Sequence, residues 1–213
     1  GLDDLGFPAS EEVVDEKVMA AARRLESLGA EVSEVSIPMH TMGPYIFRGI
    51  ILEGAADFMI RGNGAGTNWT GFYNTTLAEA FARGRRARAN DMARSVRIVL
   101  FMGAYLQRHY HGRYYAKAQN VRHHLRQGYD AAFENHDLLL MPTVPFRAAL
   151  LPEPDPSIED DLTASGTNAG NTCPTDVTGH PSMSVPCGMA EGLPIGMMIT
   201  GRHFDDSQVI AAA

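Results

Sequence analysis

The chain has 213 residues, of which 45% are hydrophobic and 20% charged, a composition typical of a globular protein with one sizeable core. Its formal net charge of -7 argues against nucleic acid as a partner, because contacts to a phosphate backbone require clustered positive charge. The sequence contains no apolar run long enough to cross a membrane and no secretory signal pattern, so we expect no membrane partner and a cytoplasmic location.

Residues 10–28 predict an amphipathic helix, because apolar residues recur at spacings of four and three. These apolar residues are Val14, Val18, Ala21, Leu25 and Leu28. Ser10 could cap the helix and Gly29 would end it. Residues 32–37 then predict a short strand ended by Pro38, and a helix followed by a strand is a unit of an α/β fold.

The middle of the chain is predicted to be helical. Residues 43–61 are too continuously apolar for a surface helix and too few to cross a membrane, which favours a buried helix. Residues 77–135 predict two or three further helices, broken near Gly103 and Gly112. We therefore expect a helical insert over about residues 43–135.

Several patterns in this region imitate ligand-binding motifs. The glycines of residues 62–66 follow a predicted helix instead of a strand, so they do not predict a phosphate-binding loop. The basic run at residues 83–88 is short and has only Phe81 nearby for stacking, which indicates a solvated helix face. Four histidines lie in the same region, namely His109, His111, His123 and His124. Because neighbouring positions on a helix point to different faces, the sequence predicts no metal site and no cofactor.

The C-terminal third of the chain predicts three short strands. One strand is expected at residues 138–141, and two more at residues 183–185 and 195–200, stopped by Pro186 and Pro194. Short apolar runs bounded by glycine and proline are typical of buried strands. The small polar residues before the second strand predict a loop at the rim of the sheet.

This polar loop holds the side chains that could act as nucleophile or base. His180 and Asp176 lie four residues apart and could serve as a base and its orienting group. Gly179 and Pro181 flank the histidine, however, and favour a turn that shapes the backbone. Cys173 is a candidate thiol nucleophile, although no neighbouring group in the sequence would lower its pKa. An independent hydrolase built on either group stays open as a hypothesis.

Three segments carry motifs that occur together in one family. They are a strand end at residues 138–142, the runs Asn-Thr, Thr-Gly-His-Pro and Ser-Val-Pro-Cys-Gly within residues 171–188, and Leu-Pro-Ile-Gly to Gly-Arg-His-Phe-Asp-Asp at residues 193–206. The helix end at residues 28–30 and the strand end at residues 37–38 fit the same pattern. Together these segments resemble the C-terminal half of the amidase signature family, in particular bacterial amidases associated with nitrile hydratases.

The resemblance implies an α/β fold, with a mixed sheet flanked by helices, and hydrolysis of a carboxamide to a carboxylate and ammonia. A serine, a cis-serine and a lysine of that family form an acyl-enzyme, and they belong to the family's N-terminal half. The two lysines here, Lys17 and Lys117, have no serine nearby in the sequence. We therefore expect residues 1–213 to be a C-terminal portion with its catalytic residues outside the chain. Its sheet-forming segments would lie at about residues 1–38 and 136–213.

The partners implied are the N-terminal half of the same amidase and a small-molecule amide, and a homodimer is left open. By resemblance, Phe47 stands where an aromatic residue faces the substrate, and Asn168 stands near a residue of the same pocket. The alternatives are a core phenylalanine and a loop-capping asparagine. A second hypothesis is a non-catalytic amidase-like subunit or binding module, which needs a partner because its sheet edges are open.

Overall fold

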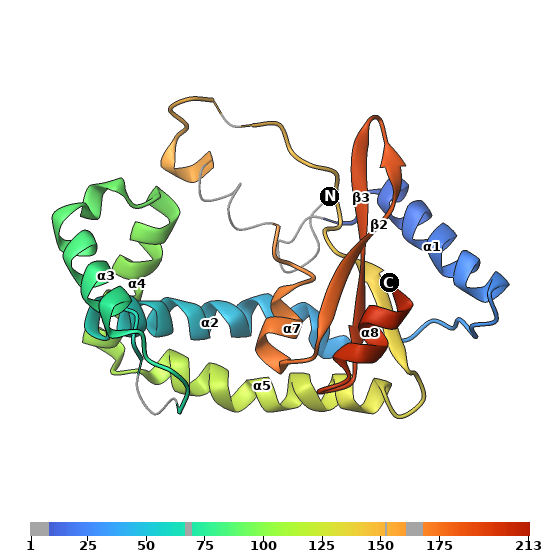
Figure 1. Cartoon of the computed structure of the whole chain (residues 1–213), viewed down its shortest axis with the longest axis horizontal. Coiled ribbons are helices and arrows are strands. Elements are labelled where there is room, and N and C mark those ends of the chain that lie inside the picture. Colours follow the sequence, from blue (N-terminus) through green and yellow to red (C-terminus); the bar gives the residue numbers. More distant parts are fainter. Residues whose placement is uncertain (1–8, 67–69, 152, 161–167) are drawn as a thin grey trace. The chain divides into compact units, whose positions relative to one another are not determined.

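The computed structural model describes residues 9–66, 70–151, 153–160 and 168–213 (Figure 1). The chain divides into two compact units. The first unit comprises Gly1–Phe47, Val121–Asp155 and Gly166–Ala213, and the second comprises Arg48–Asn120 and Pro156–Ser165.

The first unit contains a sheet whose central strand is β3. Its strands are β1 (Leu138–Pro142), β2 (Ser182–Ala190) and β3 (Leu193–Gly201), and in the described part of the chain they pair antiparallel in the order β1-β3-β2. All three predicted strands are therefore confirmed. Helices and a small sheet occur together, as expected of the α/β class.

Helices α1 (Glu12–Ser27) and α8 (Asp206–Ala212) bury the alternating apolar residues of β3. Val18 of α1 and Val209 of α8 form one cluster with Met197 and Ile199 of β3. Successive side chains of a strand point to opposite faces, so these two odd-numbered residues leave Met198 and Thr200 for the other face. One part of the core of this unit thus lies between β3 and the two helices.

The start of α1 differs from the prediction. The capping residue is Glu11, and its side chain makes no cap hydrogen bond. The Ser10 hydroxyl lies instead within hydrogen-bond distance of the Asp15 carboxylate and the Pro145 carbonyl. Ser10 therefore joins the helix to the segment after β1.

Two prolines expected to stop strands lie inside them. Pro186 pairs with Gly196, and the register shifts between Pro186 and Gly188, where β2 contains a bulge. Because β2 is an edge strand of the described sheet, the missing proline N–H at a bulge costs little pairing. Pro194 lies near the start of β3 and pairs with Met189.

The strand predicted at residues 32–37 is absent from the described structure, where this segment is irregular. Val32 and Val35 are 38% and 44% exposed. A strand requires a hydrogen-bonded neighbour, and no described strand pairs with this segment. The predicted polar loop is also partly wrong, since it contains the short helix α7 (Cys173–Thr178), which ends at Gly179 with a φ of +82°.

Most described residues from 38 to 132 are helical, while the bounds of the predicted insert, about residues 43–135, stay a prediction. The elements of this region are η1 (Pro38–Met42), α2 (Gly43–Ala55), the π-helix η2 (Ala56–Arg61), α3 (Thr75–Ala87), η3 (Ala89–Asp91), α4 (Arg94–Tyr110) and α5 (Arg113–Ala132). Helices α2 and α5 each contribute residues to both units. Among the described helices, none combines the length and apolar character needed to cross a membrane.

The predicted break near Gly112 is confirmed, and the one near Gly103 is wrong. His111 and Gly112 both have positive φ and separate α4 from α5. Helix α4 continues through Gly103, which is buried against α2. A Cβ atom at Gly103 would lie 1.9 Å from the Leu52 carbonyl oxygen and 2.8 Å from the Ala56 side chain. This glycine is therefore required by close helix packing and not by a turn.

Replacing Gly103 with alanine should destabilise the chain by about 1–3 kcal/mol, because the added methyl group overpacks the contact with backbone. Gly84→Ala is the matched control, since Gly84 lies in α3 with open space around its missing Cβ. That substitution should stabilise by about 0.5–1 kcal/mol through helix propensity. Chemical denaturation of the two variants measures both effects, and equal stabilities would contradict the packing argument.

Candidate functional site

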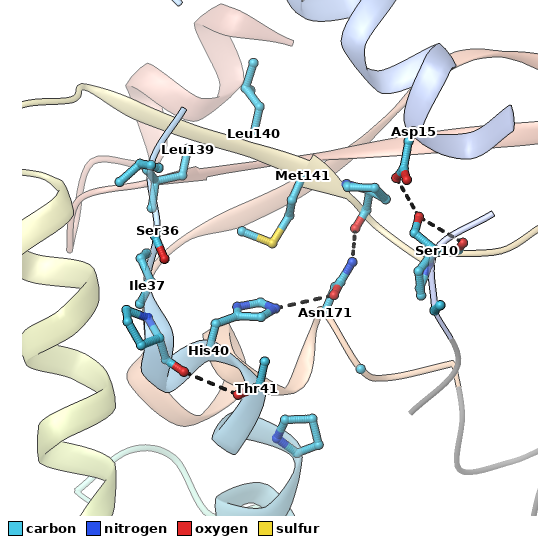
Figure 2. A pocket seen from close by; sticks show the side chains of 17 residues that line it. Ser10, Asp15, Ser36, Ile37, His40, Thr41, Leu139, Leu140, Met141 and Asn171 are labelled. Atoms are coloured by element: carbon cyan, nitrogen blue, oxygen red, sulfur yellow. Dashed lines mark hydrogen bonds between the residues drawn. The ribbon is translucent and has the colours of Figure 1, made fainter. Parts of the chain in front are cut away.

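A cavity of about 610 Å³ lies in the first unit beside β1. Its wall combines residues from the start of α1, the irregular segment before η1, β1 itself and the turn before α7, as Figure 2 shows. The polar side chains in this wall are those of Ser10, Asp15, Ser36, His40, Thr41 and Asn171. Leu139, Leu140, Met141 and several prolines supply the apolar part. An apolar cavity with a few convergent polar groups is the usual form of a small-molecule site.

A chain of hydrogen bonds fixes the polar side of the cavity. Asn171 Nδ2 donates to the Pro142 carbonyl at 2.7 Å, at the end of β1. His40 Nε2 lies 3.4 Å from Asn171 Oδ1, and His40 Nδ1 lies 2.7 Å from the Tyr129 hydroxyl. Figure 2 shows the imidazole of His40 and the amide of Asn171 facing each other. Residues from four segments, η1, α5, β1 and the turn before α7, are therefore joined at this point.

The donor and acceptor of every hydrogen bond in this series follow from the orientation of the Asn171 amide. The Pro142 carbonyl can only accept, so the Asn171 amide must present its nitrogen there and its oxygen to His40. His40 then carries its proton on Nε2, and its Nδ1 accepts from the Tyr129 hydroxyl. The chain runs from Tyr129 through His40 and Asn171 to Pro142 without a mismatched donor.

Burial keeps both titratable residues of this hydrogen-bond chain, Tyr129 and His40, neutral. Tyr129 is fully buried, and this burial raises the pKa of its phenol. Burial also lowers the pKa of His40, an effect partly opposed by its hydrogen bond to Asn171. His40 is thus an uncharged imidazole near neutral pH. In this form it can donate one hydrogen bond to a neutral amide oxygen, such as that of Asn171.

A smaller hollow of about 320 Å³ is lined by residues of α7, β2 and β3, and the predicted acid–base candidates belong to its wall. His180 and Asp176 both line it. The carboxylate that pairs with His180 is Asp130, whose Oδ1 lies 3.2 Å from His180 Nε2. The predicted pairing of His180 with Asp176 is therefore wrong in its partner. Asp176 has a raised pKa because it is partly buried.

The predicted thiol nucleophile is poorly placed for reaction. Cys173 is a free cysteine but only 4% exposed, at the start of α7. Cys187, the other free cysteine, is half-buried, and burial raises the pKa of its thiol. A reactive cysteine requires an accessible thiolate in an electropositive setting, and neither residue meets that condition.

The two residues assigned to the pocket by resemblance lie outside the wall of this cavity. Phe47 is half-buried on α2, and Asn168 is exposed in the turn before α7. Their substrate-binding role stays a prediction. Sequence reasoning missed the contacts of His40 with Tyr129 and Asn171, because separations of 89 and 131 residues along the chain give no local signal.

Comparison with known proteins supplies the family. Residues 3–210 match the protein family described as Amidase. The chain belongs to the amidase family. The resemblance of its C-terminal motifs to this family is thereby confirmed.

The chain matches only part of the length of each of the following relatives. It is 37% identical to an enantioselective amidase of Rhodococcus rhodochrous over 207 residues, which are 97% of this chain and 40% of that protein. It is 41% identical to an uncharacterized protein in the nthA 5' region of Rhodococcus erythropolis over 166 residues, which are 78% of this chain and 83% of that protein.

A solved structure confirms the fold. The crystal structure of a bacterial aryl acylamidase belonging to the amidase signature enzymes family superposes with a TM-score of 0.65 at 23% identity. The superposition covers 99% of this chain and 41% of that protein. The amidase-family chain thus spans about 40% of the length of these longer relatives and corresponds to their C-terminal part.

Replacing Asn171 with alanine should lower the free energy of unfolding by about 1–3 kcal/mol, because the Pro142 carbonyl and the His40 N–H lose their partner in a partly buried place. Asn135→Ala, at an exposed position after α5, is the matched control and should change stability by less than about 0.5 kcal/mol. Urea denaturation measures both. Equal losses in the two variants would contradict the proposed hydrogen-bond chain.

The stability of the chain should fall as the pH is lowered through about 6.5, the ordinary pKa of histidine. The folded-state pKa of His40 is lower, so the unfolded chain binds the proton first and is favoured. The groups that face His40 are the Tyr129 hydroxyl and Asn171, and Asp15 shares the cavity. His40→Gln should therefore show a smaller loss of melting temperature between about pH 7 and about pH 5. An unchanged loss would show that His40 is not buried as a neutral group.

Proposed function

We propose that this chain is the C-terminal portion of an amidase that hydrolyses a carboxamide to a carboxylate and ammonia. The hydrolysis would use a Ser-cisSer-Lys acyl-enzyme mechanism, with the catalytic residues outside this chain. The observation that carries the proposal is the family match over residues 3–210 in a sequence without the Gly- and Ser-rich signature. The chain would work in the cytoplasm, in keeping with its two free cysteines.

The cavity beside β1 supports the part that this chain would play. Its apolar wall suits an aliphatic or aromatic acyl group, and the rigid chain through His40 and Asn171 offers one polar side. Phe47 and Asn168 would complete the substrate pocket near this wall. The acyl group would be held here while the nucleophile comes from the N-terminal half.

The open edges of the sheet in the first unit support the proposal that further strands of the same amidase pair with it. Strands β1 and β2 each pair with a single neighbour among the described strands, namely β3. An unpaired strand edge presents N–H and C=O groups that pair readily with another strand. The N-terminal half of the amidase would supply such strands, and a homodimer would be formed by the completed protein.

The second candidate is a non-catalytic amidase-like subunit or binding module. The Rhodococcus erythropolis relative favours it, since the alignment covers 83% of that protein and therefore leaves little of it outside the matched region. Such a subunit would retain the cavity and bind an amide or a carboxylic acid without turnover. It would still require a partner for the open sheet edges.

An assay of ammonia release from a simple aromatic amide distinguishes the amidase portion from the non-catalytic subunit. We expect no turnover by the chain alone. Co-expression with the N-terminal part of the Rhodococcus rhodochrous enantioselective amidase should raise turnover at least about 100-fold above either part alone. Reconstitution without turnover, together with amide binding by the chain, would support the non-catalytic subunit.

Turnover by the chain alone would instead contradict the proposal and support an independent hydrolase. In that event, Cys173→Ala or His180→Ala should abolish the activity, depending on which group acts. Size-exclusion chromatography of the chain alone and with the N-terminal part measures complex formation directly.

A further inference from the structure

Three side chains outside the cavity beside β1 converge in the first unit. Asp130 comes from α5, His180 from the turn between α7 and β2, and His203 from the turn after β3. One ligand atom of each lies within 4.8 Å of the other two. We propose that Asp130, His180 and His203 form a binding site for one divalent metal ion of the zinc class.

The spacing of the donor atoms fits such an ion. Tetrahedral zinc lies about 2.0–2.1 Å from its ligands, which places the ligand atoms roughly 3.4 Å apart. His180 Nε2 and Asp130 Oδ1 are already 3.2 Å apart. Small side-chain rotations of His203 and Asp130 would bring the third atom into range. The metal would then take the place of the hydrogen bond between His180 Nε2 and Asp130 Oδ1.

The surroundings of His180 hold its ring as a metal ligand requires. The ring contacts Tyr129 and Phe133 of α5, at centroid distances of 5.4 and 5.2 Å. Its Nδ1 lies 2.9 Å from the Thr178 hydroxyl, which can accept the Nδ1 proton. Once a metal displaces the contact of Nε2 with Asp130, a hydrogen bond from Nδ1–H to the Thr178 hydroxyl would hold the tautomer that directs Nε2 at the ion. Zinc-binding histidines commonly have such a partner on their second ring nitrogen.

His203 supplies a second, independent observation. In the described part of the chain its buried Nε2 has no hydrogen-bond partner, although buried polar atoms are nearly always paired. The ring lies 4.0 Å from that of His180, centroid to centroid. Gly179 lies directly beside this ring, since a Cβ atom there would be 3.4 Å from His203 Cε1. A metal ion would account for two imidazoles so close together.

Asp130 would give a metal ion access to the site from solvent and supply a negatively charged ligand. Its side chain is 49% exposed, so an ion could enter and keep one or more water ligands. Its other carboxylate oxygen, Oδ2, lies 3.5 Å from Arg126. This arginine competes for the carboxylate but leaves Oδ1 directed at His180. Two imidazoles and one carboxylate form a donor set that suits zinc, cobalt and nickel better than magnesium or calcium.

Cobalt(II) is the probe for this site, because its visible absorption reports the ligand geometry that zinc would adopt. Titration of the full 213-residue chain should show saturable one-to-one binding, reversed by added zinc. Asp130→Asn and His203→Gln should each weaken cobalt binding at least about tenfold. Saturating zinc should raise the melting temperature of the wild-type chain by about 5 °C or more, and of the variants by much less.

The matched controls are His124→Gln and Glu134→Gln, which remove an exposed histidine and an exposed carboxylate nearby. Both should bind cobalt like the wild type. Asp130→Asn carries the test even if replacing the buried His180 prevents folding, because Asp130 is half exposed. The assignment is overturned if the wild-type chain shows no saturable binding, or if the site variants bind like the controls. Amide hydrolysis does not enter these measurements, so their outcome is independent of the proposed function.

Discussion

The amide of Asn171 is the constraint on which the cavity depends. By donating to the Pro142 carbonyl it fixes its own orientation, and this in turn fixes the proton of His40 and the direction of the Tyr129 hydroxyl. The end of β1, the turn before α7, η1 and α5 are held at one point as a result. A cavity wall built from separate segments keeps its shape only if such a network is fully satisfied.

Tyr129 connects this network to the histidine pair. Its hydroxyl belongs to the cavity chain, while its ring stacks on His180 in the neighbouring cluster. The residue is fully buried, so neither contact can change without disturbing the other. Helix α5 therefore contributes the adjacent residues Tyr129 and Asp130 to two polar sites, one beside the cavity at β1 and one at the proposed metal site.

The sequence predicted most of the elements but few of their contacts. The apolar spacing of α1 and the short runs of β1, β2 and β3 are local signals, and all four elements were found. Pro186 was predicted to end a strand but lies at a bulge of an edge strand. Gly103 was predicted to break a helix but packs against the backbone of Leu52. The roles of both residues are set by neighbours that the local sequence does not show. Residues 32–37 failed as a strand because pairing depends on a partner strand, which local propensity does not describe.

Family membership, helix α1, the long central helices and the three paired strands were determined by the sequence by itself, because motifs and periodicity are properties of neighbouring residues. The candidate sites were decided only by the tertiary structure. His40 meets Asn171 across 131 residues, and His180 meets Asp130 across 50, so no spacing in the sequence reports either contact. Folding brought these side chains together from η1, α5, β1 and the turns on either side of α7, and the chemistry of both sites follows from those contacts.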